Sequence, residues 1–336
     1  MRRLNRIIVG DARRSLAKLP EGLVDCVVTS PPYFRLRDYQ QDGQLGLEGH
    51  VDEWVEGLRQ TMRELRRVLV PTGTVWLNVG DTYSSGREGA EAKSLLLGPE
   101  RLALALAADG WTIRNRIVWA KSNPMPTSVG DRLSCGHETI LLLTRQRRYF
   151  FDLDAIRVPH LSSRPASRSG RPAWSIPVEW RGPNMGSNGG LDHYKKAGLP
   201  GHPLGKNPGD VWNLATAGYR GAHHAVFPTG IPERAIRAGC PEKRCSRCRT
   251  PWTREKARRH RQLAVLGDIK PRCQCDAPSE PGVVLDPFIG SGTTAIAAEK
   301  LGRAWLGIEI NPAFAALAQD RIAAARAAGD RDRQAA

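Results

Sequence analysis

The sequence lacks any long run of apolar residues. No stretch of its 336 residues approaches the roughly 18–20 consecutive apolar positions that a helix needs to cross a bilayer. No apolar signal core follows the basic start Met1-Arg2-Arg3. We therefore expect a cytoplasmic protein without membrane association or export. Hydrophobic residues make up 40% and charged residues 25% of the chain, which is typical of a globular protein with a substantial core.

Acidic residues are scarce relative to basic ones. The chain has 34 Asp and Glu against 50 Lys and Arg, a net charge of +16. The excess is clustered, because residues 155–224 hold nine basic and three acidic residues and residues 245–275 hold nine and two. Clustered positive charge is typical of proteins that bind a polyphosphate. Solubilising loops are the alternative interpretation.

One stretch near the amino terminus predicts a ligand site. Residues 23–28 are apolar and β-branched, which indicates a buried strand, and residues 29–33, Thr-Ser-Pro-Pro-Tyr, end it abruptly. The Ser30 hydroxyl and the Pro31 carbonyl could accept both hydrogens of an exocyclic amine on a planar base, which localises the nitrogen lone pair. Tyr33 could stack on the base. The alternative is a proline-stiffened turn with a buried tyrosine.

A second stretch predicts a nucleoside site. Residues 283–294, Val-Val-Leu-Asp-Pro-Phe-Ile-Gly-Ser-Gly-Thr-Thr, indicate a strand, a glycine turn and the start of a helix. The following strand, residues 304–308, ends in Glu309, which lies 23 residues after Asp286. That spacing is typical of an acid that binds ribose hydroxyls. A solvated strand-end acid is the alternative.

Together these motifs resemble the amino-methyltransferases of DNA, which use S-adenosylmethionine (AdoMet). The order, with the target-amine motif first and the AdoMet motif last, is similar to that of their permuted β class. The match covers most of residues 5–154 and 208–322. Further similar segments are Gly10-Asp11-Ala12, residues 74–83 (Thr-Val-Trp-Leu-Asn-Val-Gly-Asp-Thr-Tyr), residues 119–126 (Trp-Ala-Lys-Ser-Asn-Pro-Met-Pro), His137-Glu138 and residues 224–228 (His-Ala-Val-Phe-Pro).

The resemblance implies an α/β, Rossmann-like AdoMet-dependent methyltransferase fold that is circularly permuted. It implies a catalytic set of Ser30, Pro31, Pro32 and Tyr33. It implies a cofactor-binding set of Asp11, Asp286, Phe288, Gly290, Gly292, Thr293 and Glu309, in which Phe288 and the glycines hold the methionine part, Glu309 the ribose and Asp11 the adenine.

Several of these residues also have a structural interpretation. Asp11 precedes a helical segment and could cap it, with or without binding adenine. Asp81, at the end of the predicted strand 74–79, could border the base pocket or form a turn. His137 and Glu138 are expected to be scaffold or pocket-wall residues, because amine methylation in this family needs no histidine base.

The coarse organisation follows from the same patterns. Helices are predicted over 51–69 and 99–108, and a turn at Pro71-Thr72-Gly73 leads into the strand 74–79. We predict catalytic and cofactor halves of the core at 1–154 and 281–328, an irregular target-recognition insertion at 155–224, a return to the core at 225–240, a cysteine-rich insert at 241–280, and a frayed tail at 329–336. The insertion interleaves basic residues with aromatic ones that suit base contact: Trp174, Trp180, Tyr194, Trp212 and Tyr219.

Disulfide bonds are not expected among the seven cysteines of a cytosolic chain. Two close pairs with 24 residues between them instead indicate a structural zinc knuckle, with Cys245, Cys248, Cys273 and Cys275 as ligands. The insert is poor in apolar residues, so we expect the metal to be needed for its folding. Unpaired thiols or redox chemistry are the alternative, and basic residues 254–261 could contact the DNA backbone.

The serine of the target-amine motif implies the cytosine-N4 amine as methyl acceptor, since Asp-Pro-Pro-Tyr usually marks adenine-N6. The predicted function is site-specific methylation of duplex DNA from AdoMet, by base flipping and direct transfer. Adenine-N6 methylation is the first alternative, and a zinc-containing DNA-binding protein with an inactive core is the second. Protein glutamine methylation is disfavoured, because the chain lacks Asn-Pro-Pro-Tyr. A cognate restriction endonuclease, an orphan or phage enzyme, and a homodimer stay open.

Overall fold

The computed structural model describes residues 4–160, 202–217, 227–256 and 266–335. The chain divides into two compact units. The first comprises Met1–Asp152, Gly209–Thr253 and Ile269–Ala336, and the second comprises Leu153–Pro208 and Arg254–Asp268. Of the predicted target-recognition insertion, residues 161–201 and 218–226 lie outside the described residues, and with them Trp174, Trp180, Tyr194 and Tyr219.

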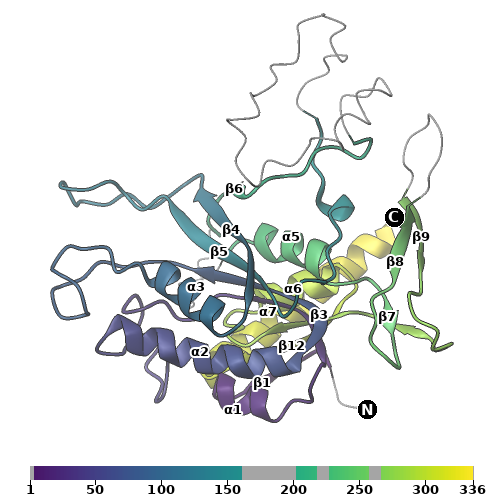
Figure 1. Ribbon diagram of the computed structural model, residues 1–336, viewed down its shortest axis with the longest axis horizontal. Helices are drawn as coiled ribbons and strands as arrows, with labels where there is room; N and C mark the ends of the chain where they lie inside the picture. Colours follow the sequence, from purple (N-terminus) through teal and green to yellow (C-terminus); the bar gives the residue numbers. More distant parts are fainter. Residues whose placement is uncertain (1–3, 161–201, 218–226, 257–265, 336) are drawn as a thin grey trace, which may run out of the picture. The chain divides into compact units, whose positions relative to one another are not determined.

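An eight-stranded mixed sheet organises the first unit (Figure 1). Its strands, in spatial order, are β1 (Arg6–Val9), β12 (Ala304–Glu309), β11 (Val283–Asp286), β2 (Val24–Thr29), β3 (Leu69–Val79), β5 (His137–Thr144), β4 (Thr112–Lys121) and β6 (Val211–Leu214). The first five are parallel, β5 is antiparallel to both of its neighbours, and β6 is parallel to β4. The two carboxy-terminal strands thus lie between β1 and β2.

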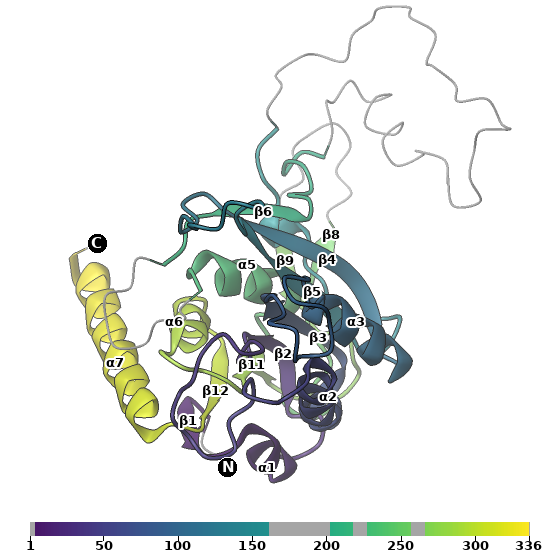
Figure 2. The same cartoon turned by 90° about the vertical axis from the view of Figure 1, so that its left-hand side faces the viewer.

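Helices cover both faces of this sheet (Figure 2). Helices α1 (Ala12–Ala17), α2 (Val51–Val68) and α3 (Gly98–Ala108) pack on one face, and α5 (Gly230–Gly239), α6 (Thr293–Lys300) and α7 (Pro312–Ala335) pack on the other. Successive side chains of β3 point alternately to the two faces of the sheet. Val75 and Leu77 join the core under α2, whereas Thr74 points to the other face and donates to the Gly239 carbonyl of α5 at 3.2 Å.

Helix α2 confirms the helix predicted over 51–69. Its first turn carries a capping box, in which His50 accepts from the Asp52 amide and Glu53 accepts from the His50 amide. Its buried stripe includes Trp54, Leu58 and Leu65, which are nearly inaccessible to solvent. This helix packs on β3, the neighbour of the strand that leads into the Ser-Pro-Pro-Tyr motif.

Two predicted boundaries and one predicted role were wrong. Strand β3 begins at Leu69, and the expected turn at 71–73 is a bulge within it, since Val24 pairs with Leu69 and Cys26 with Thr74. Helix α7 extends to Ala335, so the tail boundary predicted after residue 328 does not coincide with a helix end. Trp212, expected to contact bases, is only 2% exposed and packs on Trp76 with ring centroids 5.9 Å apart.

The small elements lie in the inserts. Strands β7 (Arg244–Cys245) and β10 (Ser279–Glu280) form one two-stranded sheet, and β8 (Thr253–Lys256) and β9 (Leu266–Lys270) form another. In the second unit, the 3₁₀ helix η1 (Asp154–Ile156) is followed by a bridge between Val158 and Lys206. Among the described helices, none combines the length and hydropathy that crossing a bilayer requires.

Candidate active site and cysteine cluster

A cavity of about 500 Å³ opens where the parallel strands β1, β2, β11 and β12 end. Nine predicted site residues line it: Asp11, Ser30, Pro31, Pro32, Tyr33, Phe288, Gly290, Thr293 and Glu309. Asp286 and Gly292 were predicted with them but are not part of its wall. The structure therefore brings the target-amine motif and most of the predicted cofactor residues together around one space, although Phe288 and the cofactor residues after it are more than 250 positions from the motif.

Tyr33 is held at its hydroxyl by a hydrogen-bond network. The hydroxyl donates to Glu138 Oε2 at 2.5 Å and accepts from Ser30 Oγ at 3.0 Å and from Asn78 Nδ2 at 2.8 Å. Burial, followed by the neighbouring Glu138 carboxylate, raises the pKa of Tyr33 well above its ordinary value, so the hydroxyl stays protonated. Glu138 is thus a pocket-wall residue, as predicted, whereas His137 is exposed on the same strand.

The other side of the Glu138 carboxylate faces a cation. Lys121 Nζ lies 2.7 Å from Glu138 Oε1, and Asn78 Nδ2 donates to Oε2 at 2.8 Å. Both Lys121 and Asn78 line the cavity and were not predicted as site residues. Asn78 could have been found from the sequence, because it is a polar residue inside the apolar strand Val-Trp-Leu-Asn-Val.

Backbone contacts fix the rest of the motif. Trp54 Nε1 donates to the Pro32 carbonyl at 2.9 Å, which ties the motif to helix α2. Gly80 follows strand β3 beneath the Tyr33 ring, and a Cβ atom there would lie 2.5 Å from Tyr33 Cε2. Only glycine leaves the space that the ring occupies.

The opposite wall of the cavity is built around Glu309. Its Oε2 accepts from the Gly290 amide and its Oε1 from the Asn311 amide, both at 2.9 Å. Burial raises the pKa of Glu309, and these two amide donors oppose the rise. Asp11 accepts from the Arg14 amide at 2.8 Å and caps α1, so the capping interpretation holds while its side chain also borders the cavity.

Thr293, the first residue of α6, has a hydroxyl that bears on whether this wall can bind AdoMet. Its Oγ1 is buried and has no hydrogen-bond partner among the described residues, although the residue lines the cavity. A hydroxyl donor at a helix amino terminus is suited to a carboxylate such as that of AdoMet. Phe288 and Phe314 add aromatic surface to the same wall. The residues present therefore fit the cofactor.

Asp286 and Asp81 are held away from the cavity by other partners. Asp286 is 1% exposed and accepts from the Thr29 and Thr294 hydroxyls at 2.6 and 2.7 Å, linking β11 to β2 and α6. Asp81 accepts from the Thr82 and Gly98 amides at 2.9 and 3.1 Å, which corresponds to the turn interpretation.

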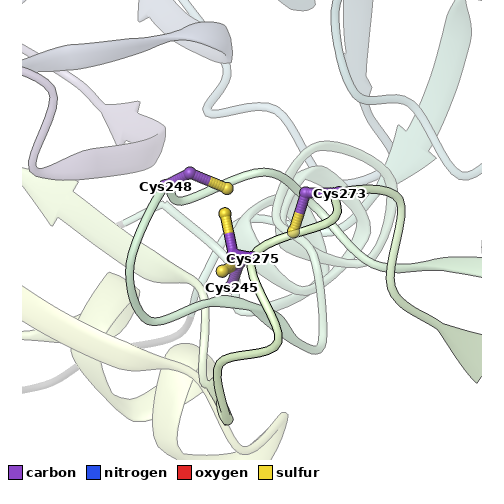
Figure 3. A group of neighbouring side chains, drawn as sticks. All are labelled: Cys245, Cys248, Cys273 and Cys275. Carbon is purple, nitrogen blue, oxygen red and sulfur yellow. The ribbon is translucent and has the colours of Figure 1, made fainter.

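The four predicted metal ligands form a second site (Figure 3). The sulfur atoms of Cys245, Cys248, Cys273 and Cys275 all lie within 4.8 Å of one another. Hydrogen bonding with Thr250 lowers the pKa of Cys248 to about 6, and hydrogen bonding with Cys248 raises the pKa of Cys275 to about 12. The cluster has the donor set and the closeness that a tetrahedral thiolate site requires, so it could hold a metal ion.

The fold and the cavity define an α/β enzyme of the AdoMet-dependent methyltransferase class. A family model described as DNA methylase (N6_N4_Mtase) matches residues 24–320, and the chain belongs to this family. It is 34% identical over 339 residues to the Type II methyltransferase M.SmaI of Serratia marcescens, covering 94% of this chain and 90% of that protein. It is 32% identical over 336 residues to M.Cfr9I of Citrobacter freundii, covering 93% and 86%.

Solved structures show the same fold. The Thermus thermophilus protein TTHA0409, in its complex with S-adenosyl-L-methionine, matches with a TM-score of 0.55 and 25% identity, covering 95% of this chain and 93% of that one. The cytosine-N4-specific PvuII DNA methyltransferase matches with a TM-score of 0.57 and 16% identity, covering 96% and 95%. The chain is therefore a DNA methyltransferase of the N6/N4 family, with AdoMet as its cofactor.

Proposed function

We propose that this enzyme methylates the N4 amine of cytosine in duplex DNA. The observation that supports this most is the position of Ser30, which lines the cavity and donates its own hydrogen to Tyr33. The lone pairs of Ser30 Oγ are therefore available to accept a hydrogen from an exocyclic amine. The serine in this motif favours cytosine, and adenine-N6 is the alternative acceptor within the same family.

Direct transfer requires the protein to hold the amine and to exclude water. When AdoMet is bound it supplies an electrophilic methyl group. Ser30 orients the amine and weakens its conjugation with the ring, and Tyr33 offers a fixed aromatic face to the base. A base inside a duplex cannot enter a cavity bounded by these residues, so the target nucleotide is flipped out of the stack. Orientation and proximity supply most of the rate enhancement.

Nucleoside mass spectrometry tests this proposal. Duplex DNA incubated with the enzyme and AdoMet should contain N4-methylcytosine, and DNA treated with Ser30→Ala should contain far less. If N6-methyladenine is found instead, the methyl acceptor is adenine and not cytosine. AdoMet binding without any methylated base on diverse duplexes would favour the inactive DNA-binding protein. Two relatives carry the name Type II methyltransferase. We therefore infer that the enzyme protects DNA from a restriction endonuclease that recognises the same DNA sequence. A homodimer stays a prediction.

We propose in addition that the cysteine cluster binds one structural zinc ion. Four thiolates at these separations satisfy zinc without any other ligand. The purified protein should contain about one zinc per chain, and the double variant Cys248→Ser/Cys275→Ser should contain almost none. Cys135→Ser is the matched control, because Cys135 is exposed and outside the cluster. Wild-type protein free of zinc, in which the four cluster thiols titrate in addition to Cys135, would favour the unpaired-thiol interpretation instead.

A further inference from the structure

Three side chains form an unbroken hydrogen-bonded chain that leads from the cavity to a carboxylate. Ser30 Oγ donates to the Tyr33 hydroxyl at 3.0 Å, and that hydroxyl donates to Glu138 Oε2 at 2.5 Å. Both hydrogens therefore point the same way, from the target-amine motif toward Glu138. All three side chains line the cavity, and Ser30, at one end of the chain, is the one that the proposed function places at the target amine.

Amine methylation produces one proton that must leave the base. The amine nitrogen forms a bond to the methyl carbon, the sulfur–methyl bond breaks, and its electron pair stays on sulfur. The methylated amine then carries a positive charge and one hydrogen more than the neutral product. It is a strong acid, because loss of this proton restores the conjugation of the nitrogen lone pair with the ring.

We propose that this proton leaves through Ser30 and Tyr33 and is accepted by Glu138, an inference that rests on the proposed amine methylation. The amine proton moves to Ser30 Oγ, the serine hydrogen moves to the Tyr33 oxygen, and the tyrosine hydrogen moves to Glu138 Oε2. Each hydroxyl gains one hydrogen and loses one, so the amine loses its positive charge, the carboxylate loses its negative charge, and the two hydroxyls stay neutral. No oxidant, reductant or further reactant is needed.

The surroundings of the chain suit this transfer. The raised pKa of Tyr33 keeps its hydroxyl protonated. The hydroxyl can therefore donate its hydrogen to Glu138 as it receives one from Ser30, and no phenolate accumulates. Lys121 Nζ, 2.7 Å from Oε1, and Asn78 Nδ2, 2.8 Å from Oε2, keep the Glu138 carboxylate oriented. The Glu138 side chain is 14% exposed and that of Lys121 is 21% exposed, which leaves a route for the proton to solvent.

Other carboxylates at the cavity are less suited to accept this proton. Asp11 and Glu309 belong to the cofactor wall, and each is already bonded to backbone amides at 2.8–2.9 Å. Ser30 alone is too weak a base to retain a proton. During methyl transfer, positive charge also builds on the amine, and a chain of hydrogen bonds that ends in a carboxylate stabilises that charge. Breaking the chain should therefore slow methyl transfer itself.

A double-mutant cycle tests the relay. Tyr33→Phe removes the middle link and keeps the ring, and Glu138→Gln removes the terminal acceptor. Each should lower the single-turnover methylation rate by about 10–100-fold, with AdoMet and DNA dissociation constants changed less than about threefold. If the two act through one chain, Glu138→Gln should have almost no further effect in the Tyr33→Phe background. His137→Ala, the exposed neighbour on β5, is the control and should retain the wild-type rate.

The outcomes separate the relay from a structural role and from the proposed function. Multiplicative effects of the two substitutions would overturn the relay, because Glu138 would then act independently of Tyr33, for example by holding Asn78. A Glu138→Gln enzyme as fast as wild type would overturn it too. The failure of the proposed function has a different signature, since wild-type enzyme would then produce N6-methyladenine or no methylated base on DNA.

Discussion

Arg244 and Asp25 form an ion pair of 2.6 Å in the interior of the protein, although 219 positions separate them. The side chain of Arg244 is 3% exposed and that of Asp25 is 1% exposed. Arg244 also donates to the Leu23 carbonyl at 2.8 Å, and Cys245, the next residue, is a member of the cysteine cluster. Through Arg244, the cluster is therefore linked to β2, the strand that ends in the target-amine motif.

Arg244→Ala should destabilise the core. It would leave the Asp25 carboxylate buried without its cation, a change that costs about 3–5 kcal/mol in the free energy of unfolding. Denaturant titration measures this. The double variant Asp25→Asn/Arg244→Met should recover part of the loss, because it removes the uncompensated charge. Equal stability of Arg244→Ala and wild type would show that the pair contributes nothing.

Gly80→Ala should impair methylation by displacing Tyr33. The new Cβ would lie 2.5 Å from the Tyr33 ring, and overpacking of this kind costs about 1–3 kcal/mol. We expect the single-turnover rate to fall at least tenfold, while AdoMet affinity is retained because Glu309 and Thr293 lie on the other wall. Gly130→Ala serves as the control, since a Cβ there meets no atom within 4 Å. A fully active Gly80→Ala enzyme would contradict the packing seen here.

The stability of the fold should depend on pH through Asp286. Burial raises its pKa to about 6, and hydrogen bonds from Thr29 and Thr294 oppose the rise. The folded state thus binds this proton more tightly than the unfolded chain, in which aspartate titrates near pH 4. The carboxyl's contribution to stability is therefore largest at low pH and is lost as pH rises from about 4 to 6, by about 2–3 kcal/mol.

The Asp286→Asn variant isolates this effect, because the amide keeps the size of the side chain and does not titrate. The unfolding free energy of wild type minus that of the variant should fall between pH 4 and 6 and stay constant above pH 6. A difference that is flat or rises across this range would rule out the raised pKa.

Leu133 should assist base flipping. It is 90% exposed in the loop between β4 and β5, and residues Met125 and Cys135 of the same loop line the cavity. Exposed apolar side chains beside a flipped-base pocket can fill the space that the base leaves in the duplex. Leu133→Ala should slow methylation about tenfold on a matched duplex and much less on a duplex with the target cytosine mispaired.

The control for this prediction is Leu104→Ala, which removes an exposed leucine of α3 that does not line the cavity. It should leave both rates unchanged. An equal loss on matched and mispaired substrates would show that Leu133 acts after flipping or not in flipping at all.

The sequence was sufficient to predict the parallel part of the sheet and the two motifs at its carboxyl edge. Apolar strands that end in proline or glycine turns have few other interpretations, so Ser30, Tyr33 and Glu309 could be placed at one edge. The partners of Tyr33 were less accessible. Asn78 can be recognised as a polar residue in an apolar strand, but single-sequence patterns do not report that Asn78 and Glu138 converge on the Tyr33 hydroxyl. Asp286 illustrates the same limit, because its motif position does not reveal that two threonines enclose it.

The spatial order of the strands also affects how the enzyme is made. Strands β11 and β12 occupy the middle of the parallel region, between β1 and β2, yet they come from residues 283–309 and are translated after the other six strands of this sheet. Until then β1 has no neighbour in the sheet, and β2 has one unpaired edge. A chain truncated before residue 283 would expose that edge to other chains. The cofactor wall around Glu309 therefore cannot form before residues 283–309 have been translated, so shorter products should be unable to modify DNA.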